Sequence, residues 1–205
     1  MGREDMELTE SGRKTKNLIF QTAVKILKEE GYDKVTVRRI CKESGTSNGS
    51  FYHFFKNKDE LLAYYYTMSA EDFMEGQKEN MKNADLYHQM LICYKWYIRY
   101  TSEFGLDFCI NFFNPNNRAV DPIYMYNAFY EISKKCLHEK SDEIREGYDA
   151  DEIAKELCIL AKGIIFDWSS SRGSYDVEKM TDRMFTVYLD GVIGRALNSS
   201  GSLQE

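Results

Sequence analysis

Apolar residues recur at helical spacing along most of the chain. Near the N-terminus, the segment Lys14–Glu30 carries apolar positions three or four residues apart, and Gly31 stands where a helix would end. These apolar positions are Leu18, Ile19, Ala23, Ile26 and Leu27. The pattern predicts a first helix over Lys14–Glu30, with one face directed at a core.

A second, shorter helix is predicted from Thr36 to Ser44. Thr36 is a good N-cap because its hydroxyl can accept a hydrogen bond from a free backbone N–H of the first turn. Gly45 follows and can adopt the turn conformation that a β-carbon disfavours. Ser47 can cap a third helix, so a helix, a short turn and a helix follow one another. This order is typical of the helix-turn-helix, whose second helix enters the major groove of DNA.

The third predicted helix lies in the stretch "TSNGSFYHFFKNKDEL", residues 46–61, which is rich in rings. It contains Gly49, although a glycine inside a helix costs about 1 kcal/mol. Small side chains at its front would let it approach base edges, while Phe51 and either Phe54 or Phe55 face inward as anchors. Donors suited to phosphate oxygens then remain on the rim at Tyr52, His53, Lys56 and Lys58.

The rest of the chain shows long helical patterns without a second motif or an internal repeat. Asn57, with Glu60 three positions later, has capping-box spacing and starts a fourth helix. The predicted helices cover Lys58–Asn80, Leu86–Phe104, Leu106–Phe113, Pro122 to about Lys140, Asp151 to about Arg172, and Val177–Asn198. Either Asp149 or Asp151 can begin the fifth of these. The sequence therefore predicts an all-α protein.

Composition and charge indicate a helical protein with one basic end. The 205 residues include only two prolines, which favours long helices, and residues 13–58 hold eleven Lys or Arg against four acidic residues. This local balance of +7 leaves −13 for the rest of a chain whose total is −6. A basic first quarter suggests a polyanion partner at one end, although a solvated charged surface would show the same composition. Without a long apolar run or an export signal, we expect a soluble cytoplasmic protein with no membrane partner.

Enzymatic chemistry is not expected from the motifs of this chain. The three histidines lie far apart in the sequence, and there is no GxSxG, HExxH or phosphate-binding glycine loop. The five cysteines lack metal-ligand spacing, so we expect no metal or other cofactor and interpret the thiols as reduced core residues. The alternative is a redox sensor that uses Cys93, Cys109 or Cys158.

The segment "TVRRICKESGTSNGSFYHFFKNKDEL" resembles the DNA-binding motif of the TetR family of bacterial repressors. With the first helix included, the similarity extends from Thr15 to Leu61. The departures replace one small residue by another: Cys41 and Ser44 stand where alanines are common, and Thr46 stands in place of valine or a similar residue. These changes leave the expected fold intact.

The resemblance implies a domain organisation and a DNA-binding surface. Residues 1–57 would form a three-helix DNA-binding head, residues 58–198 a six-helix ligand-binding and dimerisation body, and residues 199–205 a flexible tail. The implied DNA contacts are Thr36, Arg38, Arg39, Ser47, Asn48, Gly49, Ser50, Tyr52, His53, Lys56 and Lys58. Of these, residues 47–50 would face the bases of a pseudo-palindromic double-stranded operator.

The middle of the chain is rich in aromatic residues, which suits an apolar pocket for a small-molecule effector with a few polar groups. Rings at helical spacing also build ordinary cores, so both interpretations stay open. The candidate pocket residues are Tyr65, Trp96, Tyr97, Arg99, Tyr100, Phe108, Phe112, Tyr126, Phe129, Tyr130, Phe166 and Trp168.

The last two predicted helices resemble those that pair in the family's homodimers. The candidate dimerisation residues are Ile164, Met180, Met184, Val187, Tyr188, Gly191 and Val192. Packing within one chain would produce the same apolar faces. A two-fold dimer would place its recognition helices on half-sites about one DNA turn apart, or a multiple of it.

The function implied by the resemblance is a ligand-responsive repressor. A small hydrophobic or aromatic effector would shift the fourth helix and release the operator. An activator or a redox-responsive regulator with the same head is the alternative, because the sequence has no feature that separates repression from activation.

Overall fold

The computed structural model describes residues 8–112 and 128–194, apart from the side chains of residues 65–67, 69, 71, 112 and 128. In this described part every regular element is a helix, and one isolated antiparallel bridge joins Ile144 to Ile193. The all-α prediction is confirmed. None of the described helices is long and apolar enough to cross a membrane.

The helices follow one another along the chain with short connections. In order they are α1 (Glu10–Glu30), η2 (Tyr32–Lys34), α2 (Val37–Ser44), α3 (Asn48–Phe54), α4 (Lys58–Gly76), α5 (Lys78–Asn83), α6 (Leu86–Ser102), α7 (Leu106–Phe112), α8 (Ala128–Glu139), η4 (Ser141–Glu143), α9 (Ala150–Ser170) and α10 (Val177–Val192).

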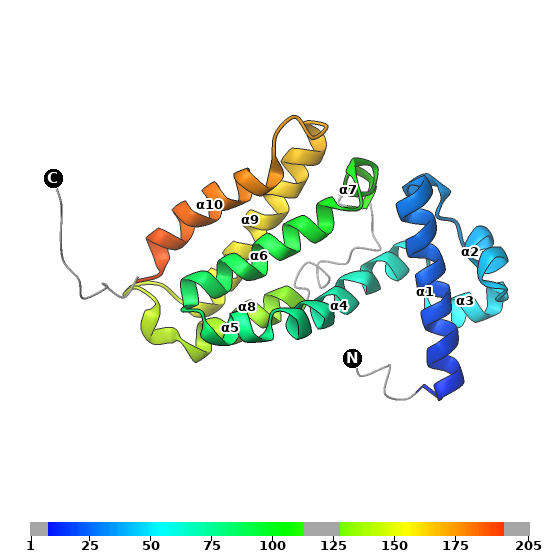
Figure 1. The fold of residues 1–205 in the computed structure, drawn as a ribbon, viewed down its shortest axis with the longest axis horizontal. Helices are drawn as coiled ribbons and strands as arrows, with labels where there is room; N and C mark the ends of the chain where they lie inside the picture. Colours follow the sequence, from blue (N-terminus) through cyan, green and yellow to red (C-terminus); the bar gives the residue numbers. More distant parts are fainter. Residues whose placement is uncertain (1–7, 113–127, 195–205) are drawn as a thin grey trace.

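The first three α-helices form a head at one end of an elongated molecule, with α2 and α3 on the side away from the body (Figure 1). The head core includes Ile26 of α1, Ile40 of α2 and Phe51 of α3, which are fully buried. Phe55 is also buried, whereas Phe54 is only partly buried. Phe55 is therefore the second aromatic anchor of the recognition helix.

Hydroxyl caps begin α2 and α3, as the sequence predicts. Thr36 Oγ1 accepts a hydrogen bond from the Arg39 N–H at 3.3 Å, and Ser47 Oγ accepts one from the Ser50 N–H at 3.0 Å. Gly45 adopts φ = 67°, the left-handed conformation in which a β-carbon would be strained. Gly45 and the Ser47 cap together fix the length of the turn between the two helices.

The first helix begins at Glu10 rather than at Lys14. Thr9 causes the earlier start, because its Oγ1 accepts a hydrogen bond from the Gly12 N–H at 3.2 Å and caps the helix there. The polar first turn has no apolar periodicity, so the hydrophobic pattern could not reveal it.

The fourth helix is shorter than predicted and is followed by a separate short helix. Asn57 Oδ1 caps α4 as expected, but α4 ends at Gly76 instead of Asn80, and Gln77 leaves helical geometry with φ = −108° and ψ = 6°. Glycine is a weak helix former, which favours a break at this point. With α5 separate, the described body has seven α-helices where six were predicted.

The last helix also ends earlier than predicted, at Val192 rather than Asn198. Ile193 is extended and bridges to Ile144, and the Gly194 N–H donates to the Glu143 carbonyl at 2.7 Å. These backbone bonds to a distant segment replace the bonds of another helical turn. The first six residues of the helix predicted from Pro122 lie outside the described residues.

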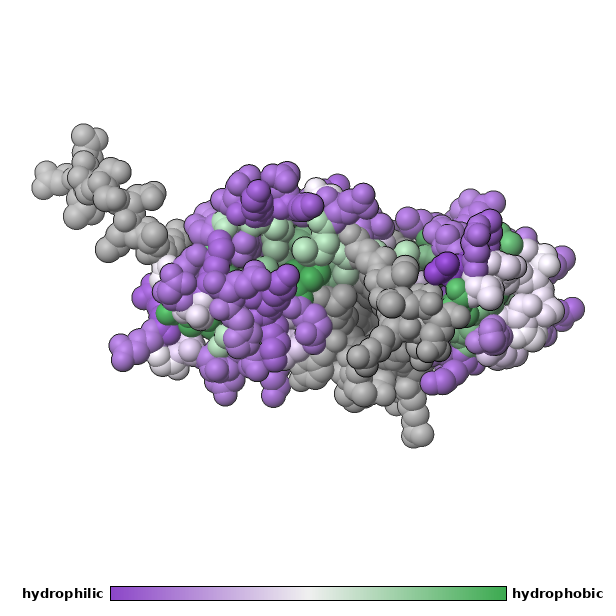
Figure 2. All heavy atoms as spheres, turned by 90° about the horizontal axis from the view of Figure 1, so that it is seen from below, coloured by the Kyte–Doolittle hydropathy of each residue, from purple (hydrophilic) through white to green (hydrophobic). Residues whose placement is uncertain are grey.

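The body is built around α6, which packs against α8, α9 and α10. The long helix α4 leaves the head and runs along the opposite side of the body from α10 (Figure 1). One face of the molecule is mostly hydrophilic, with hydrophobic atoms gathered in the middle of the body (Figure 2). Because α4 is continuous from the head to the body, a movement at one of its ends can reach the other.

Candidate nucleic-acid interface and effector body

The outer face of α3 presents short polar side chains and rings to solvent. Ser47, Asn48, Gly49, Tyr52 and His53 are all exposed. A β-carbon at position 49 would lie 3.5 Å from Ser47 Oγ, an ordinary van der Waals contact. Packing within the chain therefore does not require a glycine there. A glycine here adds no side chain to the outer face of α3, so a large partner can approach the helix backbone closely.

Two of the predicted base-facing residues are tied to one another. Ser47 Oγ lies 3.0 Å from Ser50 Oγ, in addition to its capping bond. Asn48 is the exposed amide in this set. Its carbonyl and NH2 groups match the paired acceptor and donor of adenine in the major groove.

The two neighbouring arginines of α2 have different surroundings. Arg38 is exposed, whereas Arg39 is partly buried and donates to both Glu30 and Glu43. Thr36, expected at a phosphate, is exposed but already uses its hydroxyl oxygen as a cap. The structure therefore places Arg39 in a network within the head, while Arg38 lies at the surface.

The two predicted lysines at the start of α4 also differ. Lys56 is exposed, with its Nζ 4.0 Å from Glu60 Oε1. Lys58 is partly buried, and its Nζ lies 3.9 Å from the centroid of the Tyr32 ring, which is cation–π geometry. Sequence reasoning missed Tyr32, although an aromatic residue directly after the helix stop at Gly31 was a visible signal.

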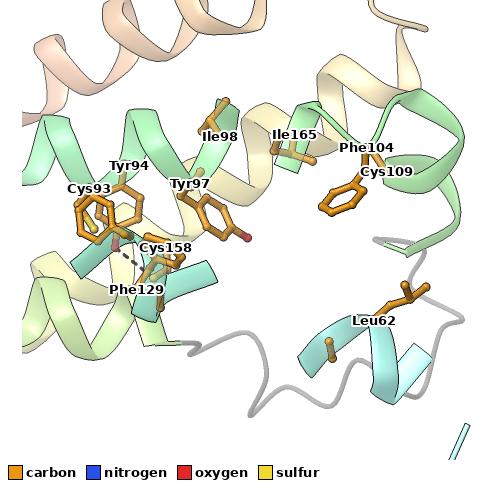
Figure 3. Close-up of a cluster of buried hydrophobic side chains, with 14 of the residues drawn as sticks. Leu62, Cys93, Tyr94, Tyr97, Ile98, Phe104, Cys109, Phe129, Cys158 and Ile165 are labelled. Carbon is orange, nitrogen blue, oxygen red and sulfur yellow. Dashed lines mark hydrogen bonds between the residues drawn. The ribbon is translucent and has the colours of Figure 1, made fainter. Parts of the chain in front are cut away.

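Five of the predicted effector residues form one network of rings. Trp96 stacks on Tyr100, with ring centroids 4.4 Å apart and 16° between the planes, and on Phe129 at 5.6 Å. Tyr97 meets Phe129 edge-on at 5.3 Å. Phe108 joins through Phe104, whose ring lies 4.9 Å away. Figure 3 shows Tyr97 and Phe129 at one end of this interior, and Phe104 at the other.

Phe73 of α4 completes the network and was missed at the level of sequence. Its ring centroid lies 5.4 Å from that of Trp96 and 5.4 Å from that of Phe129, so α4, α6 and α8 meet through rings. Phe73 is fully buried. The apolar residues of α4 recur only weakly at helical spacing, so the hydrophobic pattern did not identify Phe73 as a core residue.

Four other candidates lie elsewhere. Phe166 is 53 % exposed on α9, and Arg99 is exposed, with its Nε 3.5 Å from Glu103 Oε1. Trp168 donates its indole N–H to the Tyr175 carbonyl at 3.1 Å, and Tyr130 is partly buried beside Lys134. Phe166 and Arg99 therefore do not belong to the ring network. Tyr126 and the side chains of Tyr65 and Phe112 lie outside the described residues.

A small polar cluster is buried beside the rings. The Tyr94 hydroxyl lies 3.1 Å from Ser133 Oγ. It also lies 3.2 Å from Cys158 Sγ, and both Tyr94 and Cys158 are labelled in Figure 3. Burial raises the pKa of the Cys93 and Cys158 thiols, and it raises the pKa of Cys109 to about 12. Because the thiolate is the reactive form, burial disfavours redox sensing by these cysteines. Among the described residues no group of three His, Cys, Asp or Glu side chains could hold a metal ion.

The predicted dimerisation residues divide into two sets. Ile164 and Val192 are only 2 % and 4 % exposed, because they pack inside the chain, so they cannot meet a partner directly. Met184, Gly191 and Val187 are exposed on α10, Val187 at 70 %, and Met180 and Tyr188 are partly buried. The Tyr188 hydroxyl donates to a Glu156 carboxylate oxygen of α9.

The exposed apolar residues of α10 have counterparts on α9, which packs beside it. Ile159, Gly163 and Phe166 are exposed at spacings of four and three residues, so they share one face of α9. We call these three residues, together with Met184, Val187 and Gly191, the α9–α10 stripe. An exposed apolar stripe on two neighbouring helices is typical of an interaction surface.

The three-helix head, with its exposed third helix, defines a helix-turn-helix DNA-binding protein. Residues 19–65 match the family model described as bacterial regulatory proteins, tetR family. The head of this chain thus matches the TetR family of transcriptional regulators, as the motif had predicted.

Relatives match along most of the chain. The HTH-type transcriptional regulator SAR2658 of Staphylococcus aureus is 23% identical over 190 residues, which cover 90% of this chain and 98% of the relative. The fatty acid metabolism regulator protein of Bacillus subtilis is 23% identical over 186 residues, 85% of this chain and 93% of the relative. Both relatives are named as regulators, not as enzymes.

Solved structures show the same fold. FadR from Bacillus subtilis, in complex with stearoyl-CoA, has a TM-score of 0.65 at 21% identity and covers 85% of this chain and 98% of its own. FadR from Thermus thermophilus, a repressor in complex with lauroyl-CoA, has a TM-score of 0.69 at 15% identity and covers 91% and 100%. The similarity thus includes both the head and the body.

Proposed function

We propose that this chain is a cytoplasmic, dimeric, operator-binding repressor that a long-chain fatty acyl-CoA releases from DNA. The observation that carries the proposal is the combination of an exposed recognition helix with a body whose inner rings join α4 to α6 and α8. The two FadR structures of the same fold, with stearoyl-CoA and lauroyl-CoA, support this class of effector.

Residues 1–57 would be the DNA-binding domain and residues 58–198 the effector and dimerisation domain, followed by the tail 199–205. Asn48, Gly49, Tyr52 and His53 would face the DNA groove and its rim. Arg38, Lys56 and Lys58 would neutralise phosphates, with Thr36, Ser47 and Ser50 shaping the backbone between them. Arg39 would support this surface from within the head.

The effector would act through α4. Phe73 of α4 contacts Trp96 and Phe129, so a ligand that separates these rings also displaces α4. Only a ligand that binds the DNA-incompetent arrangement more tightly can release the operator. A coupling free energy of about 1 to 3 kcal/mol would change the operator affinity roughly 5- to 150-fold.

The α9–α10 stripe would form the dimer interface. Pairing two copies through this stripe buries apolar surface that one copy exposes, and the two-fold axis would set the distance between the two recognition helices. That distance must match the two half-sites of the operator, so a change in α4 that alters it weakens binding.

The test is an anisotropy titration of the purified protein on DNA from its own upstream region, with and without stearoyl-CoA. We expect tight binding that falls as salt rises, and a lower affinity when stearoyl-CoA is present. Free coenzyme A and stearate serve as controls for the two halves of the effector. Operator affinity unchanged by stearoyl-CoA would contradict the acyl-CoA part, and equal affinity for random DNA would contradict the operator part.

The Trp96 ring offers a direct report of effector binding. Trp96 and Trp168 are the two tryptophans of the chain, so Trp168→Phe leaves the emission of Trp96 alone. We expect stearoyl-CoA to change this emission at the concentration that releases DNA.

A further inference from the structure

Tyr32 is the place where the head meets both α4 and α7. This tyrosine forms η2 with its neighbours, directly after α1, and is only 8 % exposed. Its hydroxyl donates to Asp59 Oδ1 in the first turn of α4. The ammonium of Lys58 lies over its ring, and the ring of Phe108 in α7 has its centroid 6.4 Å away.

The contact with Phe108 connects Tyr32 to the rings of the body. From Phe108 the rings continue to Phe104 at 4.9 Å, to Tyr100 at 6.1 Å and to Trp96 at 4.4 Å. Lys28 of α1 adds a second bridge, with its Nζ 5.7 Å from the Phe104 ring centroid. A line of touching rings therefore joins the α4–α6–α8 interior to the head without passing along α4.

The ring and the hydroxyl of Tyr32 have separate effects. The ring lies under the Lys58 ammonium and limits where this charge can go. The hydroxyl is hydrogen-bonded to Asp59, so it holds η2 of the head against the first turn of α4. Since Phe108 packs on the same ring, a displacement of α7 shifts Tyr32 and, with it, both attachments.

We propose that Tyr32 is a positioning residue that places Lys58 for an operator phosphate and makes this placement depend on the position of α7. The proposal rests on the proposed DNA-binding function and deepens it, because it gives the operator contact a second route to the body. By reciprocity, operator binding then changes the stability of α7, although α7 itself carries none of the proposed DNA contacts.

This reciprocity provides a test that needs no effector. Backbone hydrogen exchange of residues 106–111 would be measured with and without operator DNA, in the full-length wild type, Tyr32→Phe and Tyr32→Leu. In the wild type, DNA should slow exchange in this segment. Tyr32→Phe keeps the ring but releases Asp59, so it should weaken the slowing while leaving the salt dependence of binding unchanged.

Tyr32→Leu removes the ring as well, so Lys58 loses its support. It should abolish the slowing over residues 106–111 and reduce the slope of log affinity against log salt by about 2, because the dimer loses one phosphate contact from each protomer. The matched control is Tyr175→Phe, which removes the same kind of tyrosine–carboxylate bond, to Asp167, from the body. Light scattering first establishes that the control has the mass of the wild type. Its hydrogen exchange over residues 106–111 and its salt slope should then equal those of the wild type.

The outcomes separate the two proposals. Wild-type protein without any preference for the operator would overturn the proposed function and this inference together. Specific binding with no effect on residues 106–111, or with the same effect in Tyr32→Phe as in the wild type, would overturn the inference alone. Because Tyr32→Phe keeps the ring packing, the test stands even where Tyr32→Leu fails to fold.

Discussion

Arg39 and Glu30 join α2 to the end of α1, with Arg39 Nη1 2.8 Å from Glu30 Oε2. Arg39 Nε also donates to Glu43 Oε1 at 2.7 Å. The hydrogen bond with Arg39 lowers the pKa of the Glu30 carboxyl, and the bond with Glu30 raises the pKa of Arg39. Arg39 is thus engaged within the head, although its neighbour Arg38 is exposed.

The two neighbouring arginines should therefore respond differently to the same substitution. Arg38→Ala should weaken operator binding and reduce the salt slope by about 2, because the dimer loses one phosphate contact from each protomer, while the melting temperature stays the same. Arg39→Ala should lower the melting temperature and leave the salt slope nearly unchanged. Thermal melts and anisotropy titrations in a salt series measure both quantities. Equal loss of salt slope in the two variants would show that Arg39 also reaches the DNA.

Lys58 should contribute one phosphate contact. Lys58→Ala is expected to lower operator affinity with a salt slope smaller by about 2, because each protomer of the dimer loses this contact. Lys135→Ala is the matched control, since Lys135 is an exposed lysine of α8 in the body. If the two variants have the same slope, Lys58 serves only to pack on Tyr32.

The α9–α10 stripe predicts the effect of a charge at Val187. Val187→Glu should convert the dimer to a monomer, because a carboxylate would be buried without a partner in the interface. Operator affinity should fall with it, since a monomer holds only one half-site. Tyr148→Glu is the control, as Tyr148 is similarly exposed but lies outside α9 and α10. Light scattering gives the mass of each variant, and a dimeric Val187→Glu protein would exclude the stripe as the interface.

The buried thiols should be chemically inert while the protein is folded. At pH 8 the raised pKa of Cys93, Cys109 and Cys158 keeps them in the neutral thiol form. We expect these three to react with a disulfide reagent such as DTNB only after unfolding, and hydrogen peroxide to leave operator affinity unchanged. Mass spectrometry identifies the cysteines that react. Rapid modification of any of the three in the folded protein, with loss of DNA binding, would restore the redox-sensor alternative.

The local features of the head were predictable from the sequence. Thr36, Gly45 and Ser47 act on backbone groups within a few residues, so their positions alone predict where α2 begins and ends and where α3 begins. The apolar periodicity of α1 and the small residues at the front of α3 are local as well. This is why the fold class and the family followed from one stretch of about fifty residues.

Contacts between residues that lie far apart in the sequence could not be predicted. A stripe of apolar residues shows which face of a helix avoids water, but not whether the same chain or another copy covers it. Ile164 and Val192 share that pattern with Val187, yet only Val187 remains exposed after the chain has packed. Phe166 likewise looked like an interior ring and lies on the surface.

Most of the helices, the caps of the recognition unit and the kind of partner that suits the basic first quarter could be inferred from the residues alone, because these features depend on neighbouring residues and on composition. Folding of the whole chain brings Arg39 to Glu30, joins Phe73 to the rings of α6 and α8, and sets Tyr32 between Lys58 and Phe108. These pairings arise from the packing of whole helices, whose relative positions no local pattern contains.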